Sequence, residues 1–178
     1  MTKAAQNETF HRLTIAAMIG SLENLDKILA KAEAHARASK IEPEVLLGAR
    51  LYPDMFSLIQ QLQYALYLPM DFAQHFSDVP APRVGYEEAT FEDVHASLKT
   101  AIAYLKAIPA GRLVERAQRV VPIFFDGTKG MPADDYAAIV EMPDFYFHLS
   151  IAYAILRHNG VPLAKKDFIG SYKSVPLG

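Results

Sequence analysis

Apolar residues recur every three or four positions in four separate parts of this chain. The first part extends from Phe10 to Arg37 without a proline, the second follows Pro53, the third follows Thr90, and the fourth ends at Gly160. This spacing is typical of an amphipathic α-helix, in which charged residues occupy the opposite face. The pattern therefore predicts four long helices and an all-α fold, a four-helix bundle.

Individual residues indicate where the second and third of these helices begin and end. Pro53 and Asp54 suit a first helical turn, because proline needs no amide partner there and a carboxylate is stabilised at the positive end. Pro69 is expected to end or kink the second helix. Thr90 and Asp93 form a weak version of a capping box at the start of the third helix.

Shorter elements are expected between and after the long helices. Pro43 suits the start of a short helix or turn. Near residues 119–130, a β-branched and aromatic run followed by Asp126-Gly127 predicts a short extended or hairpin segment. Because the connections differ in length, a simple up-down-up-down order is not required. The tail after Pro162 is expected to be irregular.

Length and composition limit the classes of function. The 178 residues suit a single domain spanning 1–178, and a hydrophobic fraction of 51% is enough for a sizeable core. A formal net charge of −2 predicts no nucleic-acid partner. The absence of cysteine excludes disulfides, cysteine nucleophiles and cysteine metal ligands. No apolar run reaches the roughly 20 residues of a membrane span, so we expect no membrane partner and a cytoplasmic location.

The stretch MPDFYFHLSIAYAILRHNG, residues 142–160, carries a carboxylate and an imidazole inside an apolar helix. Asp144 and His148 are four residues apart and therefore lie on one helix face. Such a pair can hold a divalent metal ion such as zinc, iron, nickel or manganese, together with ligands from facing helices. Alternatively, the two side chains form a hydrogen bond without a metal, or Asp144 serves the helix N-terminus and His148 is an ordinary core histidine.

Residues of the predicted second helix can complete such a site. Gln61 lies seven residues after Asp54, so the two share nearly one helix face. Either can join the pair on the fourth helix as a ligand. Alternatively Gln60, Gln61 and Gln63 cover the solvent side, although three glutamines in four positions cannot all face outward. The other histidines are expected at the solvated surface or at a helix end: His11, His35, His75, His95 and His158.

Three segments carry a resemblance to a known family: KAEAHARASKIEPEVLL, ARLYPDMFSLIQQLQ and MPDFYFHLSIAYAILRHNGVPLAKKDFIG. Together they resemble the bacterial family of unknown function DUF1993, which is grouped with the DinB/YfiT-like four-helix-bundle proteins. In that superfamily a histidine on the second helix and a His-x-x-x-His pair on the fourth typically bind a divalent metal. Some members are thiol-dependent transferases or hydrolases, and relatives often form homodimers through bundle helices.

The resemblance implies a degenerate version of that metal site. If RHNGVP matches the superfamily ending, His148 takes the place of the second histidine of the pair and Asp144 that of the first. The second helix offers glutamine, so the implied ligand set is His148 and Asp144 with Gln61 or Asp54. Two hypotheses remain open. One is a domain that binds a small molecule or forms a homodimer; the other is an enzyme dependent on zinc, nickel or iron, with unknown catalytic residues.

Overall fold

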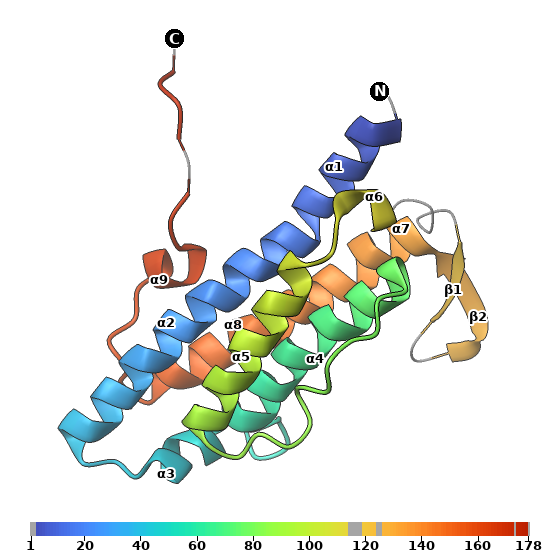
Figure 1. Ribbon diagram of the computed structural model, residues 1–178. Coiled ribbons are helices and arrows are strands. Elements are labelled where there is room, and N and C mark those ends of the chain that lie inside the picture. The colour runs from blue at the N-terminus through green and yellow to red at the C-terminus, as the bar shows by residue number, and fades with distance from the viewer. Residues whose placement is uncertain (1–2, 114–118, 124–125, 173, 178) are drawn as a thin grey trace.

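A computed structural model describes residues 3–113, 119–123, 126–172 and 174–177. Four long helices pack along one another around a shared apolar core: α2 (Ile15–Ser39), α4 (Leu58–Ser77), α5 (Phe91–Lys106) and α8 (Met142–His158). The predicted all-α four-helix bundle is confirmed (Figure 1). None of the helices in these ranges combines the length and apolarity that crossing a membrane requires.

The long helices do not alternate in direction along the chain. Lys106 Nζ lies 2.6 Å from Glu23 Oε1, and His95 Nδ1 lies 2.5 Å from Asp26 Oδ1. The later residue of α5 thus contacts the earlier residue of α2, so the two helices run antiparallel. The helices α4 and α5 run side by side in the same direction, and the loop 78–90 returns along them (Figure 1). The prediction that His95 lies on the solvated surface is wrong, because this part-buried ring links α2 to α5.

Short elements complete the chain. They are α1 (Lys3–Leu13), α3 (Pro43–Gly48), α6 (Ala110–Leu113), β1 (Val120–Ile123), β2 (Asp126–Pro132), α7 (Ala133–Tyr136), the π-helical turn η1 (Ala137–Glu141) and α9 (Lys165–Ile169). The strands β1 and β2 pair antiparallel, which confirms the predicted hairpin, although Asp126 and Gly127 belong to β2 and not to its turn. The first predicted helix is divided at Thr14 into α1 and α2.

The start of α4 corrects the sequence prediction. The helix begins at Leu58, and the amide and hydroxyl of Ser57 both donate to Gln60 Oε1, at 2.9 and 3.1 Å. Asp54 lies before the helix in an exposed turn. Pro69 lies inside the helix, which continues to Ser77. The capping box that Thr90 and Asp93 predicted for α5 is confirmed.

The loop 78–90 is held against α4 by a close backbone approach. Gly85 has a φ of 84°, and a Cβ there would lie 2.5 Å from the carbonyl oxygen of Gln63. The buried carboxylate of Glu88 accepts hydrogen bonds from the Gly85 amide and the Ser97 hydroxyl. Although burial raises the pKa of Glu88, these hydrogen bonds outweigh burial and lower it.

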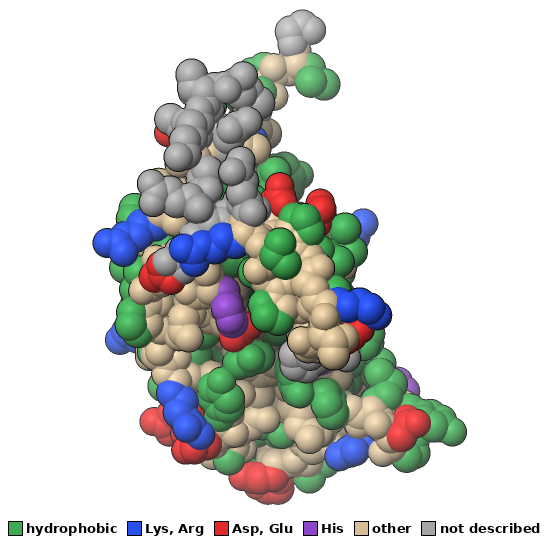
Figure 2. Space-filling view, turned by 90° about the vertical axis from the view of Figure 1, so that its right-hand side faces the viewer, with side chains coloured by type: hydrophobic (Ala, Val, Ile, Leu, Met, Phe, Trp, Pro, Cys, Tyr) green, Lys and Arg blue, Asp and Glu red, His purple; other side chains and the backbone are tan. Residues whose placement is uncertain are grey.

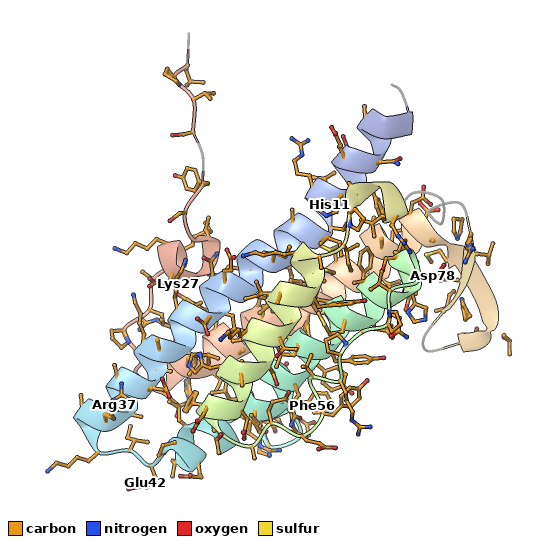
Figure 3. The ribbon with its side chains drawn as sticks, viewed as in Figure 1. His11, Lys27, Arg37, Glu42, Phe56 and Asp78 are labelled. Atoms are coloured by element: carbon orange, nitrogen blue, oxygen red, sulfur yellow. The ribbon has the colours of Figure 1, made fainter. Side chains whose placement is uncertain are left out.

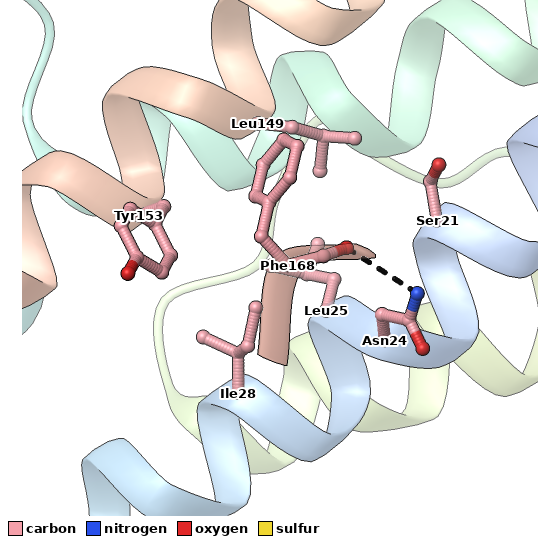
Figure 4. A pocket seen from close by; sticks show the side chains of 7 residues that line it. All are labelled: Ser21, Asn24, Leu25, Ile28, Leu149, Tyr153 and Phe168. Atoms are coloured by element: carbon pink, nitrogen blue, oxygen red, sulfur yellow. Dashed lines mark hydrogen bonds between the residues drawn. The ribbon is translucent and has the colours of Figure 1, made fainter. Parts of the chain in front are cut away.

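The end of the chain is not irregular throughout, because α9 packs against the bundle. Phe168 lies between α2 and α8 and meets the ring of Tyr153 edge-on, with 5.7 Å between centroids (Figure 4). The Asn24 amide donates to the carbonyl groups of Phe168 and Ile169. These contacts place α9 against the side of the bundle.

Candidate functional site

His148 is buried on the face of α8 that meets α4. Only 6% of the surface of His148 is exposed. Gln61, the residue opposite it on α4, is only 2% exposed. His148 Nδ1 lies 2.6 Å from Gln61 Oε1. Because a carbonyl oxygen can only accept, Nδ1 donates the proton and the lone pair of the ring lies on Nε2.

Asp144 lies one helical turn before His148 and approaches the other ring nitrogen. Its Oδ1 is 3.4 Å from Nε2, and its side chain is 42% exposed. Burial lowers the pKa of His148, and the nearby Asp144 carboxylate only partly opposes this effect. The imidazole is therefore neutral at pH 7. Two hydrogen-bond acceptors, Nε2 and Oδ1, then face each other at the edge of the protein.

Aromatic rings surround the imidazole. The ring of Tyr64 stacks on His148, with 4.7 Å between centroids and 12° between planes. Phe56 stacks on Tyr64 at 5.2 Å, and Phe147 meets His148 edge-on at 5.4 Å. Phe56, Tyr64 and Phe147 are all partly exposed. The site thus joins a buried neutral imidazole to a solvent-accessible aromatic surface near Phe56, at the start of α4 (Figure 3).

The structure brings together three of the four predicted site residues. His148, Asp144 and Gln61 meet between α4 and α8. Gln61 acts on the histidine, because its oxygen accepts from Nδ1. Asp54, in its exposed turn, has no contact with this cluster in the described part of the chain, so its role as a ligand stays a prediction. Gln60 is engaged at the N-terminus of α4.

These residues do not fit the three-ligand metal site that the resemblance implies. Among the residues that the structure describes, no group of three or more histidine, aspartate or glutamate side chains is placed to hold a metal ion. In the described part of the chain, His148 Nε2 and Asp144 Oδ1 are the candidate ligand atoms that lie close together, at 3.4 Å, and amide oxygen is a poor ligand for zinc or nickel. The contacts that the structure places here are hydrogen bonds and ring stacking.

Sequence analysis missed a second polar cluster, which lies toward the other end of α4. Glu141, the last residue of η1, is only 4% exposed, and it continues the spacing of Phe145 and His148 on the core-facing stripe of α8. It adjoins Asp71 and His75 of α4. Burial, reinforced by the charges of Asp71 and Asp144, raises the pKa of Glu141 to about 7. The spacing alone could have identified this buried carboxylate.

Comparisons with known proteins agree with this fold. The crystal structure of a DinB family member protein from Shewanella denitrificans is similar to this chain with a TM-score of 0.88 and 29% sequence identity. The similarity covers 96% of this chain and 98% of the other. No curated protein matches the sequence. The model of a domain of unknown function, DUF1993, matches residues 10–169, and this chain belongs to that family.

Proposed function

We propose that this protein binds a small organic molecule at His148. The observation that carries the proposal is the pair of acceptors, His148 Nε2 and Asp144 Oδ1, at 3.4 Å from each other beside partly exposed aromatic rings. Two acceptors at one point favour a hydrogen-bond donor between them. The rings of Tyr64 and Phe147 favour a flat apolar body. The ligand class is therefore a flat molecule that carries an N–H or O–H group.

The role of Gln61 supports this proposal. Its hydrogen bond to Nδ1 selects the tautomer in which Nε2 accepts, and the burial of both residues holds the ring in one orientation. A neutral ring costs little to desolvate when a ligand covers it, whereas a buried charge is expensive. The site is thus prepared to accept a donor without first losing a proton.

Ligand-detected NMR with a library of small flat heteroaromatic compounds tests the proposal. Compounds that carry a ring N–H or O–H should bind, and the His148→Gln variant should lose them. The variant His158→Gln is the matched control, because His158 lies on the same helix but is exposed. Binding that survives in His148→Gln, or a library without any such ligand, would contradict the proposal.

A divalent-metal-dependent enzyme, of the hydrolase or thiol-transferase type, is the second candidate. It is favoured by the hydrogen bond from Nδ1 to Gln61, because metal-binding histidines usually donate their other ring nitrogen in this way. Elemental analysis of protein purified without chelators distinguishes this candidate from the small-molecule binding proposed above. Stoichiometric zinc, nickel or iron, with a lower melting temperature after EDTA, would favour the enzyme. Sedimentation of the same preparation tests the expected homodimer.

A further inference from the structure

A cavity of about 220 Å³ lies between α4, β1, α7 and the π-helical turn η1. One water molecule needs only about 10–15 Å³ of such space, so there is room for a small organic molecule. Three ionisable residues line the cavity, Asp71, His75 and Glu141. The other walls are aromatic or apolar: Tyr67, Phe72, Phe76, Val121, Pro122 and Tyr136. Figure 2 shows the face with the hairpin, where a histidine and an acidic side chain are exposed side by side.

Glu141 lines this cavity, and one of its carboxylate oxygens is buried. Its carboxylate accepts a hydrogen bond from Tyr136, but Oε2 has no hydrogen-bond partner among the residues that the structure describes. Buried polar atoms are almost always paired, so an unpaired carboxylate oxygen at a cavity points to a ligand that supplies the donor. Glu141 also ends the π-helical turn η1, a rare geometry that is frequent at functional sites.

The charges of the other two ionisable residues, Asp71 and His75, balance each other. His75 Nδ1 lies 3.3 Å from Asp71 Oδ2. The hydrogen bond to Asp71 raises the pKa of His75 to about 9, so at neutral pH the pair holds one positive and one negative charge. Burial, with Asp71 next, raises the pKa of Tyr67, which stays protonated and donates to Asp71. His75 also attracts Glu141, but its charge is already matched by Asp71, so an ionised Glu141 leaves the three residues with a net negative charge.

We propose that this cavity binds a small organic amine, with its ammonium group on Glu141 Oε2 and its apolar part against Phe72, Phe76 and Val121. An ammonium group supplies the missing donor and the missing positive charge. The faces of the surrounding tyrosine and phenylalanine rings also attract cations. An anion is disfavoured, because Asp71, Asp144 and Glu141 all repel it. This amine site is separate from the proposed site at His148.

Calorimetric titration of the full chain with three probes of one shape tests the charge of the ligand. Benzylamine should bind at least roughly tenfold more tightly than benzyl alcohol or benzoate, because only the amine forms a charge-assisted hydrogen bond. If benzyl alcohol binds as tightly as benzylamine, or if neither binds, the proposal is wrong.

The pH dependence of benzylamine binding tests the role of Glu141. The groups that face it are Tyr67, Asp71 and His75 from α4, Tyr136 from α7 and Asp144 from α8, while β1 contributes only apolar residues. Between pH 8 and pH 6 His75 stays charged, so Glu141 dominates the change. Affinity should fall toward about tenfold per pH unit below 7. An affinity that is independent of pH over this range would contradict the proposal.

Substitutions locate the site. Glu141→Gln should weaken benzylamine binding roughly tenfold or more and remove its pH dependence, whereas Glu92→Gln, on the exposed face of α5, should change neither. His148→Gln should also leave benzylamine binding unchanged, which separates this site from the one proposed above. Circular dichroism confirms that each variant is folded. Amide shifts that the amine induces in the wild-type chain should centre on Asp71 and Glu141; shifts centred on His148 would overturn the proposal.

Discussion

Replacing Glu141 with glutamine should make the protein more stable at high pH and have little effect at low pH. Glu141 is almost fully buried, and burial raises its pKa from 4.5 to about 7. In the unfolded chain the group ionises near its ordinary pKa, so above that pH the folded state binds more protons than the unfolded state. Stability then falls as pH rises, and the loss is complete above pH 7. Glutamine has the same shape and no charge to bury.

The size of the effect follows from the two pKa values. A difference between 4.5 and about 7, at about 1.4 kcal/mol per unit, corresponds to about 3 kcal/mol in total. Part of this loss has already occurred at pH 5, because the unfolded carboxyl is ionised there. Between pH 5 and pH 8 the difference in unfolding free energy between Glu141→Gln and wild type should therefore grow by roughly 2 to 3 kcal/mol.

Urea unfolding at pH 5, 6, 7 and 8 measures this difference. The helix signal in circular dichroism suits the chain, which contains no tryptophan. Glu92→Gln serves as the control, because it removes an exposed carboxylate without removing a buried charge. A constant difference for Glu141→Gln across the four pH values, or a variant less stable than wild type at pH 8, would refute the reasoning from burial.

Five further substitutions have defined outcomes. Gln61→Leu should cost about 1–3 kcal/mol in urea unfolding, because the His148 Nδ1–H loses its buried acceptor. Gln61→Glu should raise the pKa of His148, seen as a higher midpoint in an NMR titration of its ring protons. Gly85→Ala should lower the free energy of unfolding by more than about 1 kcal/mol, because a Cβ would lie 2.5 Å from a backbone oxygen. Gly20→Ala should instead raise the free energy of unfolding by up to about 1 kcal/mol, because nothing lies within 4 Å of the added Cβ. Thr90→Ala should lower the unfolding free energy by about 1 kcal/mol, because the N-terminus of α5 loses its cap.

The long helices could be predicted because each one buries a stripe of apolar side chains, and these residues recur every three or four positions in the sequence. The capping box at Thr90 is likewise local, and the structure confirms it. The start of α4 could not be settled in this way, because Pro53-Asp54 and Ser57-x-x-Gln60 are both acceptable N-terminal signals. The helix begins with the Ser57-x-x-Gln60 signal, which places Gln60 at the N-terminus and leaves Asp54 exposed.

The candidate sites depend on contacts between residues far apart in the sequence. The inward position of His148 follows from its place in an apolar helix, but its partner Gln61 lies 87 residues away, so the pairing depends on how the helices pack. Glu141 was not considered as a core residue, although its spacing from Phe145 and His148 fits the buried stripe, because a carboxylate on such a stripe is unusual. Its neighbours Asp71 and His75 become informative only when α4 and α8 are packed together.

Asp144 connects the protonation of two residues that never touch. Its negative charge raises the proton affinity of Glu141 and also that of His148. A cation that neutralised Asp144 would make Glu141 release its proton more readily and His148 harder to protonate. Linked equilibria are reciprocal, so a charge that arrives near either residue must alter how Asp144 attracts cations. The Asp144 carboxylate, at the surface of α8, thereby couples the protonation of Glu141 to that of His148.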